Sequence, residues 1–314
     1  MNLTDDRDQQ RVVESLVHLY DDGAFPRREL IDRLTRRLGS GAAVLAALEG
    51  LGLMHLTSDQ AAAQDGAACP TDVKVPLNAP DIDAKMIEFD GKAGKIFAHL
   101  AVPKAPGAKP RPAVLVVHEN RGLTEHIKDV TRRVARAGFV GLGIDLVSRA
   151  GGSYKITDPE EAAAAYRKTE RNAMLEDMIS GLEYLKAQKF VNGARLGAVG
   201  FCAGGGNIFN LAAASRDLTA GVVFYGGPPN PLSALDNMTA ALLCNFAADD
   251  ARITGQAPAL IAALAEKKKS FGFHIYPGTG HAFHNDTGPR YVRAAACNAW
   301  ANTLDFFNLH LLKA

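Results

Sequence analysis

The sequence of 314 residues lacks an excess of either charge, long apolar runs and abundant cysteine, and each absence excludes a class of protein. The sequence has 35 lysines and arginines against 34 aspartates and glutamates, so its formal net charge is +1. It therefore lacks the excess of positive charge that is typical of nucleic-acid-binding proteins. No apolar run reaches the roughly 18 residues that a membrane helix needs. The 47% of hydrophobic residues nevertheless suffices to bury a sizeable core.

Cysteine is scarce and irregularly placed. The four cysteines form no CxxC pair and show no metal-type spacing. This pattern predicts free thiols, no disulfide framework and no metal site, and a cytoplasmic location is the default expectation for such a chain. The four are Cys69, Cys202, Cys244 and Cys297.

Residues 1–72 are expected to form a helical extension and a linker. Val12, Leu16 and Leu19 fall on one face of a helix. The segments 27–38 and 42–53 have the same helical character, and a polar stretch containing Gly and Pro follows them. The extension therefore precedes the main domain, which is expected over residues 75–314.

An alternative for the N-terminus is an export signal. Arg27 and Arg28 precede a fairly apolar stretch that starts at Gly39, which is the order of a twin-arginine signal and would predict a periplasmic location. Charged residues directly after the pair, and Glu49 inside the apolar stretch, favour ordinary amphipathic helices instead. Export, dimerisation and cover over a pocket all stay open for this segment, and a homodimer is a possible partner state.

From residue 84 onward, short apolar segments alternate with longer amphipathic helices. This alternation predicts an α/β fold with a doubly wound, mostly parallel sheet, in which two strands precede the first crossover helix. The middle segments are apolar on both faces, as expected where helices cover both sides of the sheet. The predicted strands are 85–91, 94–103, 112–119, 139–146, 195–201, 220–227, 240–248 and 271–278.

Chemically capable side chains follow four of these strands, where doubly wound folds bind ligands. Three of them occur in the order nucleophile, acid, base: Cys202, Asp250 and His281. The stretch "GFCAG" around Cys202 has the G-x-nucleophile-x-G pattern of a strand–turn–helix elbow, in which a tight turn requires glycines on both sides.

The physical chemistry of this turn suits a cysteine nucleophile. A thiol at a helix N-terminus is favoured as thiolate by the helix dipole. His281 would accept its proton, and Asp250 would hold the imidazole in the needed tautomer. The backbone N–H groups of Ala203 and Asn120 are the candidate donors to an oxyanion.

Five segments in order, "VVHENRGL", "GFVGLGIDL", "VGFCAGGG", "DARI" and "GHAFHND", resemble the dienelactone hydrolase family (carboxymethylenebutenolidases). The resemblance implies an α/β-hydrolase fold and hydrolysis of a small lactone or ester without a metal or organic cofactor. It implies Cys202 as nucleophile, His281 as base and Glu119 as a gate on the resting cysteine. It also favours Asp250 over Asp249 as the orienting acid.

Two departures from the family pattern concern the substrate. The arginine that the family places shortly after the histidine is here Asn285, and its other carboxylate-binding arginine is replaced by alanine in "EEAAAAYR". Arg121 could substitute for them. The reaction class is therefore expected to be that of the family, while the particular substrate stays open.

The remaining cysteines and histidines are expected to be ordinary core or surface residues. His284 forms an HxxH with His281, but no acidic ligand accompanies the pair at metal spacing, so no zinc site is expected there. The residues without an assigned role are Cys244, Cys297, His18, His55, His126, His274 and His310.

Two other functions compete with hydrolysis. The stretch "GFCAGGG" matches G-x-x-x-G-x-G, which cradles a pyrophosphate in short-chain oxidoreductases. However, several strands precede it, and neither a Tyr-x-x-x-Lys pair nor the expected acidic residue follows. A non-catalytic binding module is the second competitor, and the complete set of nucleophile, acid and base argues against it.

Overall fold

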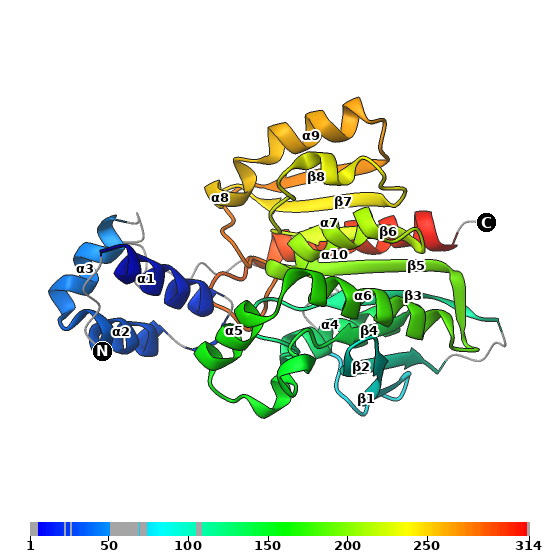
Figure 1. Ribbon diagram of the computed structural model, residues 1–314, viewed down its shortest axis with the longest axis horizontal. Coiled ribbons are helices and arrows are strands. Elements are labelled where there is room, and N and C mark those ends of the chain that lie inside the picture. Colours follow the sequence, from blue (N-terminus) through cyan, green and yellow to red (C-terminus); the bar gives the residue numbers. More distant parts are fainter. Residues whose placement is uncertain are drawn as a thin grey trace.

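The computed structural model describes residues 6–21, 23–25, 27–50, 69, 74–104 and 109–312. Most of the predicted linker, and His55, lie outside these residues. An eight-stranded sheet flanked by helices forms the body of the molecule (Figure 1). Three N-terminal helices stand at one end of this body, beside α5 (Pro159–Lys168).

The sheet has the strand order β1-β2-β4-β3-β5-β6-β7-β8. Its first two strands run antiparallel to their neighbours, and the other six are mutually parallel. Each strand segment predicted above is present, so the mostly parallel sheet is confirmed. The strands are β1 (Ile82–Gly91), β2 (Gly94–Pro103), β3 (Arg111–Val117), β4 (Val140–Ile144), β5 (Val191–Phe201), β6 (Leu218–Phe224), β7 (Ala241–Ala247) and β8 (Phe271–Tyr276).

Helices cover both faces of the sheet, which explains why its middle strands are apolar throughout. Alternate residues of β3 belong to the apolar clusters of opposite faces: Leu115 to the cluster that includes residues of α6, α7 and α9, and Val114 to the one that includes residues of α4 and α10. The helices of the body are α4 (Glu125–Arg136), α6 (Arg171–Lys186), α7 (Ala203–Ala214), α8 (Ala251–Thr254), α9 (Ala257–Glu266) and α10 (Arg293–Phe307). Short 3₁₀ turns occupy Ser148–Ala150, Ser153–Lys155 and Leu232–Leu235, and a π-helical turn, Asn308–Leu312, follows α10.

The N-terminal extension is helical, as predicted, and packs on the body. It comprises α1 (Asp6–Asp21), α2 (Arg27–Leu38) and α3 (Gly41–Gly50). Leu16, Leu19 and Leu30 form a small apolar core that includes Ala163 of α5. Arg33 of α2 adds an ion pair of 2.6 Å to Glu160 of α5. The extension is thus anchored by both apolar and charged contacts.

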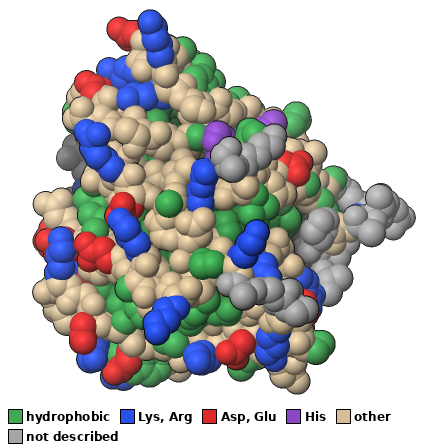
Figure 2. Space-filling view, turned by 90° about the vertical axis from the view of Figure 1, so that its right-hand side faces the viewer, with side chains coloured by type: hydrophobic (Ala, Val, Ile, Leu, Met, Phe, Trp, Pro, Cys, Tyr) green, Lys and Arg blue, Asp and Glu red, His purple; other side chains and the backbone are tan. Residues whose placement is uncertain are grey.

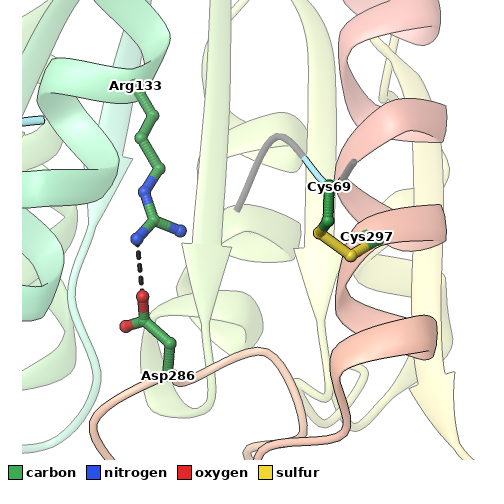
Figure 3. The surroundings of a disulfide bond; sticks show 4 residues. All are labelled: Cys69, Arg133, Asp286 and Cys297. Atoms are coloured by element: carbon green, nitrogen blue, oxygen red, sulfur yellow. Dashed lines mark hydrogen bonds and ion pairs between the residues drawn. A yellow bond between two sulfur atoms is a disulfide. The ribbon is translucent and has the colours of Figure 1, made fainter. Parts of the chain in front are cut away.

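A disulfide links Cys69 to Cys297 of α10, across 228 positions of sequence (Figure 3). The expectation of free thiols and no disulfide, and of no role for Cys297, is therefore wrong. Residue spacing carried no signal because the two partners meet only through the tertiary fold. Cys202 and Cys244 take part in no disulfide.

Charged side chains are dispersed over the surface that is turned away from the N-terminal helices. Figure 2 shows lysines and arginines interspersed with acidic and neutral side chains on that face. Within the described residues, no helix combines the length and the apolar character that crossing a membrane would require.

Candidate active site

Cys202 occupies a strained turn between β5 and α7. Its φ of 55° is in the left-handed region, which a residue with a Cβ rarely adopts. The turn is held because the Cys202 N–H donates to the carbonyl of Phe224 at 3.0 Å and the Gly206 N–H donates to the Cys202 carbonyl at 3.2 Å. Such strain persists only where surrounding contacts enforce it, and it is concentrated at functional sites.

The glycines beside Cys202 are required by close backbone approaches. A Cβ at Gly200 would collide with the carbonyl of Gly204. One at Gly204 would lie 2.5 Å from the carbonyl oxygen of Val117 at the end of β3. The G-x-C-x-G pattern is therefore explained by packing of the turn against the neighbouring strand.

His281 and Asp250 form a hydrogen-bonded pair at the ends of β8 and β7. Nδ1 of His281 lies 2.5 Å from Oδ2 of Asp250, and both side chains are buried. Burial alone would raise the pKa of Asp250, but the hydrogen bond with His281 and the charge of Arg252 outweigh it and lower the pKa. The carboxylate is therefore ionised at neutral pH and holds the imidazole.

The two adjacent aspartates differ in their surroundings. Asp249 is exposed and contributes its backbone N–H to the carbonyl of Thr279 at 2.9 Å. Asp250 faces His281 and also accepts a hydrogen bond of 3.4 Å from the Ile253 N–H at the start of α8. Helix capping and contact with the histidine are thus made by the same carboxylate.

The predicted nucleophile and base lie close together. The metal-ligating atoms of Cys202 and His281 are within 4.8 Å of each other. The elements that place them are the β5–α7 turn and the loop after β8, whose strands are separated in the sheet by β6 and β7. Parallel strands bring their carboxyl ends to one edge, so the sheet itself assembles Cys202, Asp250 and His281.

A fourth side chain, His18 of α1, enters the site, a contact that the expectation of an ordinary core or surface residue did not include. Its Nε2 lies 3.1 Å from Sγ of Cys202, and its ring is centred 4.9 Å from that of His281. Burial, reinforced by the positive charge of Arg252, lowers the pKa of His18 from 6.5 to about 4, so the ring is neutral at pH 7. The contact between His18 and Cys202 spans 184 positions, so no local sequence pattern indicates it. The one indication in the sequence is a histidine that stands among the leucines of an amphipathic helix.

The residues after β3 form a polar network beside the turn. Glu119 is buried, and the Nδ2 group of Asn285 donates to its two carboxylate oxygens at 3.0 and 3.2 Å. Arg121 lies 3.9 Å from the same carboxylate. Asn285, which replaces the family arginine, therefore serves to hold Glu119.

A cavity of about 960 Å³ opens in front of the turn, between α1 and α5. Asn120 and Ala203, the predicted oxyanion donors, are on its wall, whereas Arg121 is not among the described residues that line it. The N-terminal extension supplies the opposite wall, including Leu16 and His18. Helix α1 therefore forms one side of this cavity.

The other histidine near the site, His284, belongs to the core. It is fully buried against Phe201 and Phe224, and burial holds its pKa well below 6.5. His126 is also buried, with Nδ1 3.0 Å from Asp286. His284 thus packs among aromatic side chains of the core, whereas His281 faces Asp250.

The strand order, the strained G-x-C-x-G turn after β5, and the acid and histidine after β7 and β8 define an α/β-hydrolase. The model of the dienelactone hydrolase family matches residues 96–311, and the chain belongs to that family. The protein is therefore a hydrolase of carboxylic esters or lactones.

Individual relatives agree with this assignment. A protein of Saccharolobus solfataricus assigned as a carboxymethylenebutenolidase is 32% identical over 257 residues, which cover 71% of this chain and 97% of the relative. A Bradyrhizobium protein assigned as 2-oxo-3-(5-oxofuran-2-ylidene)propanoate lactonase is 33% identical over 226 residues, covering 68% and 90%. A crystal structure assigned as a dienelactone hydrolase of Klebsiella pneumoniae superposes with a TM-score of 0.67 at 26% identity, covering 73% and 99%.

Proposed function

We propose that Cys202 is the nucleophile of this hydrolase and that Cys202, His281 and Asp250 act as a catalytic triad. The observation that carries the proposal is the 2.5 Å hydrogen bond between Asp250 and His281, with the imidazole within 4.8 Å of the thiol. The carboxylate fixes the tautomer of the ring, so that the other ring nitrogen can exchange a proton with the thiol. The position of Cys202 at the N-terminus of α7 further favours the thiolate.

The reaction proceeds through a thioester. The Cys202 thiolate attacks the substrate carbonyl carbon, and the negative charge moves to the carbonyl oxygen, which the N–H groups of Ala203 and Asn120 stabilise. The bond to the alcohol oxygen then breaks, and protonated His281 gives that oxygen a proton. His281 next removes a proton from water, hydroxide attacks the thioester, and the acid leaves as Cys202 returns to thiolate.

Glu119 and Arg121 have supporting roles in this proposal. The buried Glu119 carboxylate controls activation of the resting Cys202 thiol when substrate binds. Its hydrogen bonds from Asn285 hold the carboxylate beside the turn that carries Cys202. Arg121, 3.9 Å from Glu119, is the candidate ligand for a substrate carboxylate. The Bradyrhizobium relative is named for a lactone that carries a propanoate group, which makes an anionic lactone the first substrate to test.

The test of the nucleophile is hydrolysis of p-nitrophenyl acetate by Cys202→Ala. Turnover should fall to the background rate, and Cys202→Ser should be strongly impaired because a serine hydroxyl gains little from a site that favours a thiolate. Cys244→Ala is the matched control, since Cys244 is buried in β7 away from the turn and should retain activity. Retained activity in Cys202→Ala would refute the assignment.

We further propose that the chain, with its N-terminal helices retained, works in an oxidising compartment such as the periplasm. The Cys69–Cys297 disulfide supports this location, because disulfides persist outside the reducing cytoplasm. Fractionation of the native host, followed by thiol alkylation without reductant, provides the test. The full chain should be found in the periplasmic fraction with Cys69 and Cys297 protected from alkylation; recovery from the cytoplasm with both thiols alkylated would contradict the proposal.

A further inference from the structure

We infer that His18, Cys202 and His281 form a binding site for a zinc ion, completed by the N-terminal helix. Their ligating atoms, one sulfur and two imidazole nitrogens, all lie within 4.8 Å of one another. In the described part of the chain this is the one group of three such side chains that approach so closely. A thiolate with two imidazoles is a donor set that suits Zn²⁺ and excludes the hard cations Mg²⁺ and Ca²⁺.

The spacing fits a tetrahedral ion after a small adjustment. With Zn–S near 2.3 Å and Zn–N near 2.0 Å, sulfur and nitrogen ligands stand about 3.6 Å apart. The Sγ of Cys202 and Nε2 of His18 are already 3.1 Å apart, and an ion would draw the third ligand inward by about 1 Å. Movement of this size is within the reach of side-chain rotation of His281 in the loop after β8.

The surroundings support the ligands as they do in established zinc sites. Nδ1 of His281 is hydrogen-bonded to Asp250 at 2.5 Å, which turns Nε2 into the ligating nitrogen and makes it more basic. A Cys202 thiol that binds the ion releases its proton to solvent, and the S–Zn bond takes its place.

Four charged side chains act on the His18 ring, which are Arg121, Arg252, Arg290 and Asp250. Each of those arginines has an acidic neighbour: Arg121 with Glu119, Arg290 with Asp21, and Arg252 with Asp250. The negative charges of the Cys202 thiolate and the Asp250 carboxylate therefore favour binding of a divalent cation at this site.

The site also has an entrance and a fourth position. His18 is on the wall of the 960 Å³ cavity, so an ion and a water molecule can reach the ligands from solvent. Three protein ligands with one open position resemble the catalytic rather than the structural zinc sites of proteins. Because the ion would occupy the lone pair of the proposed nucleophile, we expect it to inhibit ester hydrolysis reversibly; this consequence rests on the proposed function.

The binding test uses the metal-free, disulfide-intact full chain, so that Cys69 and Cys297 offer no thiolate. Calorimetric titration with Zn²⁺ should give one ion per chain, and Co²⁺ should give a sulfur-to-cobalt absorption band that Cys202→Ser lacks. His18→Ala should weaken Zn²⁺ binding by about 100-fold or more, since removal of mere supporting groups costs about 10- to 100-fold. His18→Gln keeps a polar side chain and should bind equally poorly, whereas Gln10→Ala, an exposed position of the same helix, should bind as the wild type.

Other outcomes would overturn the inference. Wild-type affinity in His18→Ala and His18→Gln would show that the helix supplies no ligand, and an unchanged cobalt band in Cys202→Ser would place the ion elsewhere. Inhibition by Zn²⁺, with recovery on adding a chelator, is measured separately with p-nitrophenyl acetate. If Cys202→Ala still hydrolyses the ester, the proposed triad fails while the binding result stands; if no ion binds, the zinc inference fails while the triad stands.

Discussion

Nε2 of His18 lies 3.1 Å from Sγ of Cys202, although 184 positions separate the two residues in the sequence. Helix α1 is therefore part of the site that residues 119–285 build. Because α1 is held by apolar contacts with the other two N-terminal helices and with α5, the His18 contact is positioned by a folded unit. The extension and the hydrolase body should be studied together.

The acid of the triad can be tested by a matched pair of variants. We predict that Asp250→Asn lowers kcat of ester hydrolysis by about 100-fold or more, because the amide can stabilise the wrong tautomer of His281. Asp249→Asn changes the same group on the adjacent, exposed residue and should leave kcat near the wild-type value. Steady-state kinetics with p-nitrophenyl acetate distinguishes them, and an equal loss in both variants would contradict the assignment.

The glycine at 204 should be indispensable to the turn. An added Cβ would lie 2.5 Å from the Val117 carbonyl oxygen, so β3 and α7 would have to separate. We expect Gly204→Ala to lower the free energy of unfolding by about 2–3 kcal/mol, measured by urea titration. Gly227→Ala is the control, because its Cβ would meet Ile253 at an ordinary 3.4 Å. Equal stability of both variants would refute this account of the turn.

Reduction of the disulfide should destabilise the fold. A link that closes a loop of more than 200 residues restricts the unfolded chain strongly, and we expect Cys297→Ser to lower the free energy of unfolding by about 4 kcal/mol. Adding dithiothreitol to the wild type should reproduce the effect, and the reductant should have no further effect on the variant. If dithiothreitol left the urea midpoint of the wild type unchanged, the result would argue against the disulfide.

The buried ion pairs of Asp286 predict a pH-dependent stability. Burial alone would raise the pKa of Asp286, but His126 and Arg133 outweigh it and hold the pKa far below the ordinary value (Figure 3). The stabilisation is therefore complete above the unfolded-state pKa of about 4 and is lost progressively as the pH falls below it.

Asp286→Asn should consequently cost about 3 kcal/mol at pH 7, because it leaves Arg133 with one buried partner fewer. The difference in unfolding free energy between wild type and variant should shrink steadily from pH 5 to pH 3. Urea titrations across this range provide the measurement. A difference that is constant with pH would mean that the charge of Asp286 does not carry the effect.

The sheet and the turn were predictable because their signals are local. Apolar segments of strand length, separated by amphipathic helices, anticipated each of the eight strands, and glycines around Cys202 marked the turn. Asp250 and His281 followed from their places after the last two strands, since parallel strands end at one edge. Chain order left Asp249 and Asp250 both open, and the resemblance to the dienelactone hydrolase family favoured Asp250.

The disulfide and the contact of His18 could not be predicted in the same way. Cys69 lies in a polar, alanine-rich stretch and Cys297 in a helix. The residues around each cysteine give no indication that the two are paired. His18 reaches Cys202 because three helices pack on α5, which is a tertiary outcome of many weak contacts. A homodimer likewise stays a prediction, because it depends on a surface outside this chain.

The wall that α1 contributes to the cavity bears on which molecules this enzyme can accept. A substrate that reaches the sulfur of Cys202 must fit its acyl and alcohol portions into the space between that sulfur and α1, so bulky groups on either portion weaken binding. Small lactones, in which the acyl and alcohol portions are joined in one ring, fit this space better than long open-chain esters. Removal of the N-terminal helices would therefore broaden the range of esters that are hydrolysed and lower the selectivity among them.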